Sequence, residues 1–146
     1  MTVCGHRFLL CHGSPESIKE CLGEETSEVR LRGWAATCEA DVVVCAHSHR
    51  AFAKRIKGVW FVNTGTVGRP VDGDPRACYC LAQAEEEFFQ FEHRRVDYDT
   101  ERAAQDILSQ GLPPVFARMI REGVDLLATR QGVRCPDVFS LPCRLR

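Results

Sequence analysis

The chain has 146 residues, 45% of them hydrophobic and 27% charged, which is the length and composition of one ordinary globular domain. Its formal net charge of -1 provides no cluster of positive charge for non-specific nucleic-acid binding, so no nucleic-acid partner is predicted. No apolar run approaches the roughly 20 residues that cross a bilayer, and no membrane association is predicted. Nine cysteines without a secretory signal pattern indicate a reducing compartment, so we expect a cytoplasmic protein.

The first third of the chain is predicted to contain strand, helix and strand. Residues 1–13 are expected to form a strand, because the run Phe8–Cys11 is apolar on both faces. An amphipathic helix is predicted next, since apolar residues follow the i, i+3, i+4, i+7 spacing at Leu31, Trp34, Ala35 and Cys38. Val42–Cys45 is a second apolar run. This order favours a parallel strand pair with a right-handed crossover.

Two hairpins are predicted in the middle of the chain. Residues 52–62 alternate around a turn at Lys57-Gly58, and residues 77–82 are expected to pair with residues 88–96 across an acidic tip. Between the hairpins lies the loop Asn63–Pro70, whose glycines permit unusual backbone dihedrals and close approach to a ligand.

Two helices are predicted after the second hairpin. Asp99 or Thr100 is a suitable N-cap for the first helix, which Gly111 ends. Pro113-Pro114 opens the next helix and Gly123 ends it. Because the residues beyond show no clean periodicity, we expect one domain over residues 1–123 and a separate tail over residues 124–146.

Three histidines follow the two strands predicted in the first third of the chain. His12 comes directly after Phe8–Cys11, whereas His47 and His49 follow Val42–Cys45 with one serine between them. Ligands of open α/β sheets bind beyond the carboxyl ends of the strands, so we expect these imidazoles to meet. Neutral imidazole binds zinc, iron, nickel and manganese. The pattern therefore predicts a metal site, with surface or hydrogen-bonded histidines as the alternative.

A second interpretation of the same stretch is a mononuclear zinc site. Cys45, His47 and His49 would supply its ligands, with Cys11 nearby. Structural zinc sites usually draw on C-x-x-C pairs, which this sequence lacks. Cys78 and Cys80 alternate along a predicted strand and are interpreted as small core residues.

Five short segments of the sequence form a recognisable series: HGSP at residues 12–15, AHSHR at 46–50, NTGTVGRPVDGDPRACY at 63–79, RRVDYD at 94–99, and GLPP from 111. These segments resemble the C-terminal half of the calcineurin-like metallophosphoesterase superfamily, in its small bacterial and archaeal phosphodiesterase branch. The similarity covers roughly residues 7–123, and the long glycine-containing segment is its most specific part. The implied fold class is α/β: a partial αββα sandwich with a mixed sheet, hairpins and flanking helices, whose N-terminal half is absent from this chain.

The resemblance also implies a function. Members of the family hydrolyse phosphate esters at a dinuclear centre of divalent ions, here Mn, Ni, Fe or Zn, which polarise a phosphoryl oxygen and lower the pKa of a bound water. By position, His12 and His47 look like ligands of one ion and His49 like a ligand of the other. Asn63, Gly65 and Arg69 are the predicted substrate-binding residues. No catalytic residue can be carried over to this chain.

Two departures from the family pattern affect this prediction. Ala46 stands where a glycine usually precedes the first histidine. The D-x-H, GDxxD and GNHD segments have no counterpart ahead of Phe8, so no carboxylate neutralises paired cations. We therefore expect either the histidine-rich half of a phosphodiesterase or phosphatase, or a catalytically inactive module that binds metal or protein. An exposed sheet edge would favour self-association or a partner chain that covers it.

Overall fold

The computed structural model describes residues 1–86 and 88–126. Most of the predicted tail, residues 127–146, lies outside the described residues. The described strands are β1 Thr2–Val3, β2 His6–Leu10, β3 Val42–Cys45, β4 Phe52–Ile56, β5 Val59–Asn63, β6 Ala77–Ala84 and β7 Phe89–Val96. The described helices are α1 Glu28–Thr37, α2 Thr100–Ser109 and α3 Pro114–Glu122.

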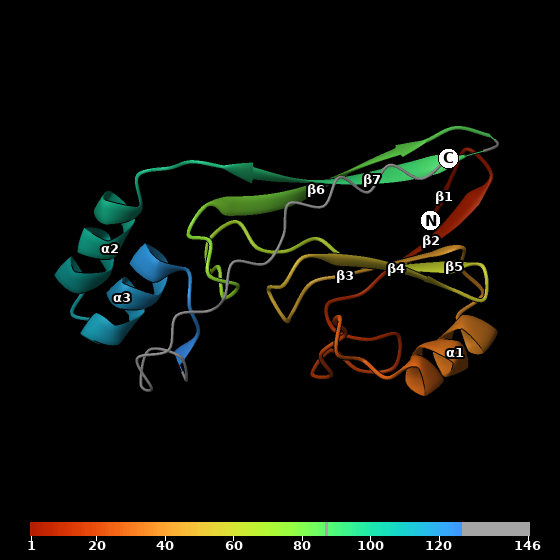
Figure 1. The fold of residues 1–146 in the computed structure, drawn as a ribbon, viewed down its shortest axis with the longest axis horizontal. Helices are drawn as coiled ribbons and strands as arrows, with labels where there is room; N and C mark the ends of the chain where they lie inside the picture. The colour runs from red at the N-terminus through yellow and green to blue at the C-terminus, as the bar shows by residue number, and fades with distance from the viewer. Residues whose placement is uncertain (87, 127–146) are drawn as a thin grey trace.

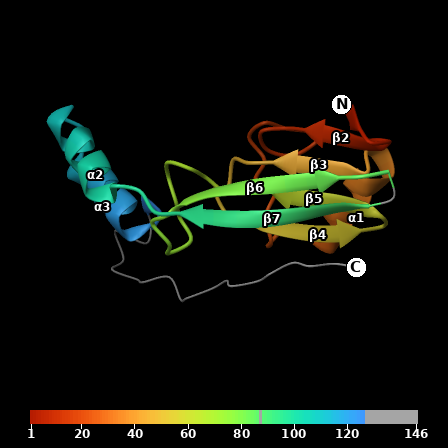
Figure 2. The same ribbon diagram turned by 90° about the horizontal axis from the view of Figure 1, so that it is seen from above.

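The elements form stacked layers with a helical pair at one end. A five-stranded sheet has the order β1-β2-β3-β5-β4, and β6 pairs with β7 in a second sheet. Helix α1 covers one face of the five-stranded sheet, while the β6–β7 hairpin lies across the other face (Figure 1). Seen from above, α2 and α3 lie beyond one end of that hairpin (Figure 2). The expected fold class, a partial αββα sandwich with mixed sheet, hairpins and helices, is confirmed.

The centre of the large sheet is parallel, as the strand, helix and strand order predicts. Strand β3 pairs in parallel with β2 on one side and with β5 on the other, whereas β4 pairs antiparallel with β5. The hairpin turn falls at Lys57 and Gly58, both with positive φ (52° and 87°), the geometry that matches strand twist in two-residue turns. The carboxyl ends of β2, β3 and β5 consequently lie at one edge of the sheet.

The single strand expected over residues 1–13 is instead a short hairpin. Cys4 and Gly5 have φ values of 46° and 78°, and the chain reverses there so that β1 pairs antiparallel with β2 through Thr2 and Val3. Glycine permits this turn at little cost, which the apolar pattern alone does not reveal. Strand β1 covers only the start of β2, and Leu10 at its other end is 61% exposed.

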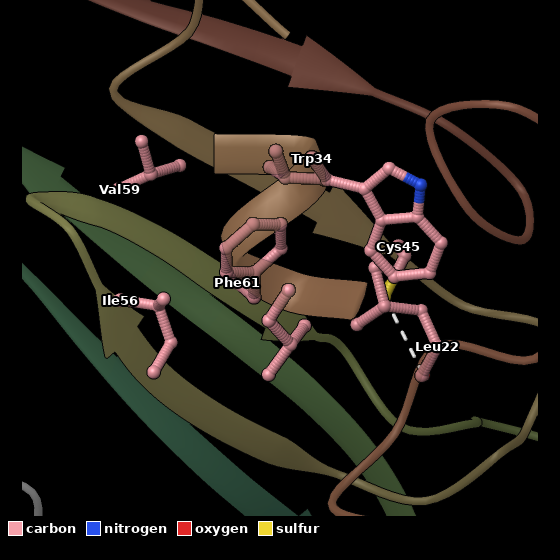
Figure 3. Packing of buried hydrophobic residues seen from close by; sticks show 8 residues of the cluster. Leu22, Trp34, Cys45, Ile56, Val59 and Phe61 are labelled. Carbon is pink, nitrogen blue, oxygen red and sulfur yellow. Dashed lines mark hydrogen bonds between the residues drawn. The ribbon is translucent and has the colours of Figure 1, made fainter. Parts of the chain in front are cut away.

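The main core lies between α1 and the five-stranded sheet. Ser27 caps α1 by accepting a hydrogen bond at its Oγ from the backbone N–H of Arg30 (3.3 Å), which satisfies one of the free donors of the first turn. Leu31 and Trp34 then face inward and are almost fully buried. Figure 3 shows Trp34 packed with Leu22 and Phe61 in this core. The predicted apolar face of α1 is confirmed.

A second cluster joins the two sheets. Trp60 and Val62 of β5 contact Phe91 of β7, and partly buried aromatic rings extend the cluster. The ring centroids of Trp60 and Phe91 are 5.9 Å apart, with their planes inclined at 62°, the edge-to-face arrangement that aromatic pairs prefer. This contact fixes the β6–β7 hairpin over the sheet and therefore over the loop that follows β5.

The helical pair has the ends that the sequence predicts. Asp99 caps α2 through a hydrogen bond from the N–H of Arg102 (2.9 Å), and Gly123 ends α3 in the left-handed conformation, with φ 66°. Each of the three described helices has ten residues or fewer. None of them is both long enough and apolar enough to cross a bilayer.

Candidate metal centre

His12 and His47 are brought together by the parallel pairing of β2 and β3. Their backbones continue the ladder beyond the strands, because the N–H of Cys11 donates to Val44 O and the N–H of Ala46 donates to His12 O (both 3.0 Å). The two imidazoles then meet edge to face, with ring centroids 4.8 Å apart. His47 Nδ1 and His12 Nε2 are separated by 2.8 Å. One ring therefore donates an N–H to the other.

The separation of these two nitrogens fits two ligands of one metal ion. Ligand nitrogens lie about 2.1 Å from such an ion, so two of them are about 3.0 Å apart at right angles and about 3.4 Å apart in a tetrahedral site. His47 Nδ1 and His12 Nε2 are slightly closer than that, at 2.8 Å. An ion bound to both would replace the shared proton, and the rings would turn so that both lone pairs point at it.

His49 is held by a different contact. Its Nδ1 lies 3.0 Å from the carbonyl oxygen of Arg69, and because a carbonyl only accepts, Nδ1 carries the proton. The other nitrogen, Nε2, of the neutral ring is then unprotonated. Histidine ligands of metals are commonly oriented in this way by a carbonyl on the opposite ring nitrogen. This contact leaves Nε2 as the nitrogen of a neutral His49 ring that has a lone pair for an ion.

The backbone at both histidines of the H-x-H pair is strained. His47 and His49 have φ values of 52° and 59°, in the left-handed region that costs a non-glycine residue roughly 1–2 kcal/mol. Between them, the N–H of Ser48 donates to Ala46 O at 2.6 Å, which closes a very tight turn. Such strain is concentrated at functional sites, where the side-chain position matters more than local stability.

Asn63 supports this turn from below. Its side chain is fully buried, and Nδ2 donates to Leu22 O (3.3 Å), to Ser48 Oγ (2.9 Å) and to Ala46 O. Its Oδ1 accepts from the N–H of Gly65 (3.0 Å). The sequence predicts Asn63 as a substrate-binding residue, but the structure places its amide beneath the site, with its hydrogen-bonding groups already engaged. Asn63 is therefore a support for the histidine turn.

Gly65 and Arg69 occupy the loop above Asn63. Gly65 is buried with φ 77°, and a Cβ there would lie 2.7 Å from Cys78 Sγ, so both the dihedral and the space require glycine. Gly65 lines the pocket described below, whereas Arg69 does not and has an exposed side chain. The contact of Arg69 with the site is its carbonyl on His49. Substrate binding by either residue stays a prediction.

Gly13 packs the loop after β2 against the strand end that carries His12. A Cβ at Gly13 would lie 2.5 Å from Ser17 O and 2.6 Å from Glu20 O, which are backbone atoms that cannot easily move. Beside it, the buried Ser14 donates from Oγ to Glu20 Oε2 (2.5 Å). The small residue after His12 is thus required by packing, which the HGSP pattern does not itself explain.

An open pocket of about 410 Å³ lies over these elements. Its lining includes all three predicted ligands together with Gly65, and also three apolar or weakly polar residues, namely Val67, Cys78 and Cys80. The sequence predicts none of the last three as site residues. The two cysteines do behave as small packed residues, and Val67 lies between the glycines of the predicted ligand-binding loop. The position of Val67 between these glycines is the one sequence feature that could have identified it as a site residue.

The alternative zinc site with Cys45 does not fit this geometry. Cys45 Sγ points into the core beneath α1 and lies 3.8 Å from Leu22 O (Figure 3). Burial raises the pKa of the Cys45 thiol to about 12 and also raises the pKa of Cys11. A zinc ligand must be a thiolate, and neither thiol lines the pocket.

The residues of this chain fit part of a metal centre. His12 and His47 are close enough to share one ion, and His49 also lines the pocket. Within residues 1–86 and 88–126, no group of three or more His, Cys, Asp or Glu side chains is placed to hold an ion together. The imidazoles of His12 and His47 meet as the sequence predicts, but His49 does not join them in one group that holds an ion.

The fold and site define an α/β sandwich whose histidines gather at the carboxyl ends of parallel strands. Residues 1–87 match the sequence model of the calcineurin-like phosphoesterase superfamily domain. That segment is more than half of the chain, and the chain belongs to this superfamily. The resemblance seen in the sequence is confirmed.

Solved structures share the fold of this chain, and an archaeal protein is similar to part of its sequence. A hypothetical protein of Pyrococcus horikoshii superposes with a TM-score of 0.72 at 15% identity, covering 84% of this chain and 49% of that one. A metallophosphoesterase of Sphaerobacter thermophilus gives 0.68 at 21% identity, covering 82% and 56%. An uncharacterized protein of Methanocaldococcus jannaschii is 31% identical over 50% of this chain and 35% of its own length. The chain thus spans about half the length of these solved proteins.

Proposed function

We propose that this chain contributes the histidine-rich half of a metal-dependent phosphoesterase centre that acts on phosphodiesters or phosphomonoesters. His12 and His47 would bind one divalent ion, and His49 would bind a second through Nε2. The observation that carries this proposal is the 2.8 Å separation of His47 Nδ1 and His12 Nε2, which brings two ligand atoms to one point in an open pocket. Membership of the superfamily supports the same reaction class.

The role of the protein residues in this proposal is to position groups. A bound divalent ion, which could be Mn, Ni, Fe or Zn, supplies positive charge that polarises a phosphate ester. The parallel strand ends fix His12 beside His47, and the Arg69 carbonyl orients the His49 ring. Gly65 allows the loop backbone to approach the bound ester closely, and Arg69 remains the proposed cationic contact for a substrate at the rim.

The first test measures metal content and hydrolysis together. Purified protein dialysed against manganese, nickel, iron or zinc is expected to retain ions that a chelator removes. It is also expected to hydrolyse bis-p-nitrophenyl phosphate, most strongly with the ion it binds best. Metal-free protein provides the matched control. Undetectable metal together with no turnover contradicts the proposal for this chain.

A second candidate function is association through the edge of β2. Strand β1 covers only the first residues of β2, and Leu10 at the far end is 61% exposed. Exposed strand edges with apolar side chains tend to pair with further strands. Residues 1–123 would then act as the C-terminal half of a domain that a second chain, or another copy, completes. We expect a dimer or larger species in sedimentation at micromolar concentration, and a strictly monomeric species contradicts this candidate.

A reducing cytoplasm remains the proposed location. All seven cysteines among the described residues have free thiols, a composition that oxidising compartments rarely preserve. Disulfides detected by thiol titration of freshly isolated protein would contradict this assignment.

A further inference from the structure

Part of the pocket lining beside the histidines has no role in the proposed function. Its volume of about 410 Å³ falls within the range of small-molecule sites and exceeds the size of a phosphate group. Besides the histidines, the lining includes Val67, Cys78 and Cys80, together with the uncharged polar residues Thr64, Thr66 and Tyr79. A phosphate held at the imidazoles therefore leaves room for a group esterified to it.

The remaining lining carries no formal charge at neutral pH. The described residues that line the pocket include no Lys, Arg, Asp or Glu. Burial raises the pKa of the Cys80 thiol to about 11 and raises the pKa of Cys78 as well, so both thiols stay protonated. A charged ester group placed here would lose hydration without gaining an ion pair. An apolar group would gain from leaving water.

Val67 is the exposed apolar residue of this lining, and its loop is anchored on both sides. The Val67 residue is 67% exposed. Before it, the N–H of Thr64 donates to Cys45 O (3.0 Å). Around it, Thr66 O accepts from the N–H of Cys78 (2.8 Å), and Thr66 Oγ1 accepts from the N–H of Arg69 (3.2 Å). These bonds hold the backbone so that Val67 stands at the pocket instead of collapsing onto the core.

We propose that the pocket is a subsite for an apolar ester group, aryl or alkyl, of a phosphate-ester substrate, and that Val67 determines this preference. The inference rests on the proposed function, because the imidazoles, with or without an ion, are what would place the phosphate beside Val67. Substrates whose ester group is a sugar or carries further charge are then poor ligands of this subsite.

The test compares two probes of equal charge and different apolar area, dimethyl phosphate and diphenyl phosphate. Their dissociation constants are measured from backbone amide shifts in NMR titrations, once with zinc and once with a chelator. Diphenyl phosphate is expected to bind at least about tenfold more tightly, since its rings bury more apolar surface. The ratio is expected in both buffers, because it does not depend on the ion, and the Val67 amide should be among those that shift.

Val67→Asp is expected to reduce the ratio to less than about twofold by placing a charge in the subsite. Val29→Asp is the matched control, since Val29 lies on α1 and is 81% exposed, and the ratio should not change. Equal affinities for the two probes, a full preference in Val67→Asp, or no shift of the Val67 amide at roughly 10 mM diphenyl phosphate overturns the inference. An intact ratio without metal binding or hydrolysis contradicts only the proposed function, whereas hydrolysis with a ratio near one contradicts only the subsite.

Discussion

His47→Ala is expected to lower the affinity of the chain for its divalent ion by at least about 100-fold and to abolish metal-dependent hydrolysis. The two nitrogens that converge at 2.8 Å are reduced to one by this change. Groups that merely orient a ligand contribute about 10–100-fold to metal affinity, and a ligand itself contributes more. Calorimetric titration with zinc or manganese measures the loss directly, without relying on turnover.

His6→Ala is the control for this experiment. His6 lies outside the pocket, where Nε2 meets Glu85 O at 2.8 Å and the ring packs against Phe89. Its replacement removes an imidazole from the same sheet and is expected to leave metal affinity unchanged. If His47→Ala binds metal as tightly as the unmodified chain, the assignment of His12 and His47 to one ion is wrong.

Asn63→Leu is expected to destabilise the protein by about 3–5 kcal/mol, although the two side chains have the same branched shape. The change leaves the N–H of Gly65 without its partner. It also removes one donor from each of the carbonyls of Ala46 and Leu22, which keep their contacts with the Ser48 N–H and with Cys45 Sγ. A buried polar group left unpaired costs about 1–3 kcal/mol, and each of the other lost hydrogen bonds costs about 0.5–1.5 kcal/mol. Urea denaturation monitored by tryptophan fluorescence reports the loss as a lower midpoint with a similar slope.

Ser48→Ala is the control that distinguishes the loss of a single hydrogen bond near the turn from the loss of the whole Asn63 amide. Ser48 makes one of the contacts of Asn63 and is only half-buried, so its loss should cost about 1 kcal/mol or less. A cost for Asn63→Leu as small as that for Ser48→Ala would show that Asn63 does not support the histidine turn.

Local patterns were sufficient to predict most of the elements. Val42–Cys45, the turn at Lys57-Gly58 and the glycine that ends α3 are each encoded by adjacent residues, and each is where the sequence predicts it. The N-terminal hairpin was missed because an apolar run such as Phe8–Cys11 has the same appearance in a single strand and in one arm of a hairpin. Only the dihedrals at Cys4 and Gly5 distinguish the two.

The site was less predictable because its contacts join residues far apart in the chain. Parallel pairing explains why His12 and His47 meet, and the sequence shows where the two apolar strands before them end. The amide of Asn63 and the carbonyl of Arg69 could not be assigned in this way. Their roles depend on where the loop after β5 passes beneath and beside the H-x-H turn. A side chain in a ligand-like loop can support the site without facing a ligand.

The left-handed backbone at His47 and His49 has a consequence for directed evolution of this protein. Glycine or asparagine adopts this conformation at lower cost, so a library sorted by thermal resistance alone would enrich those residues at both positions. The variants selected in this way would have a higher melting temperature and would lack the imidazoles. Sorting by retained metal instead would keep both histidines and would have to recover stability elsewhere in the chain.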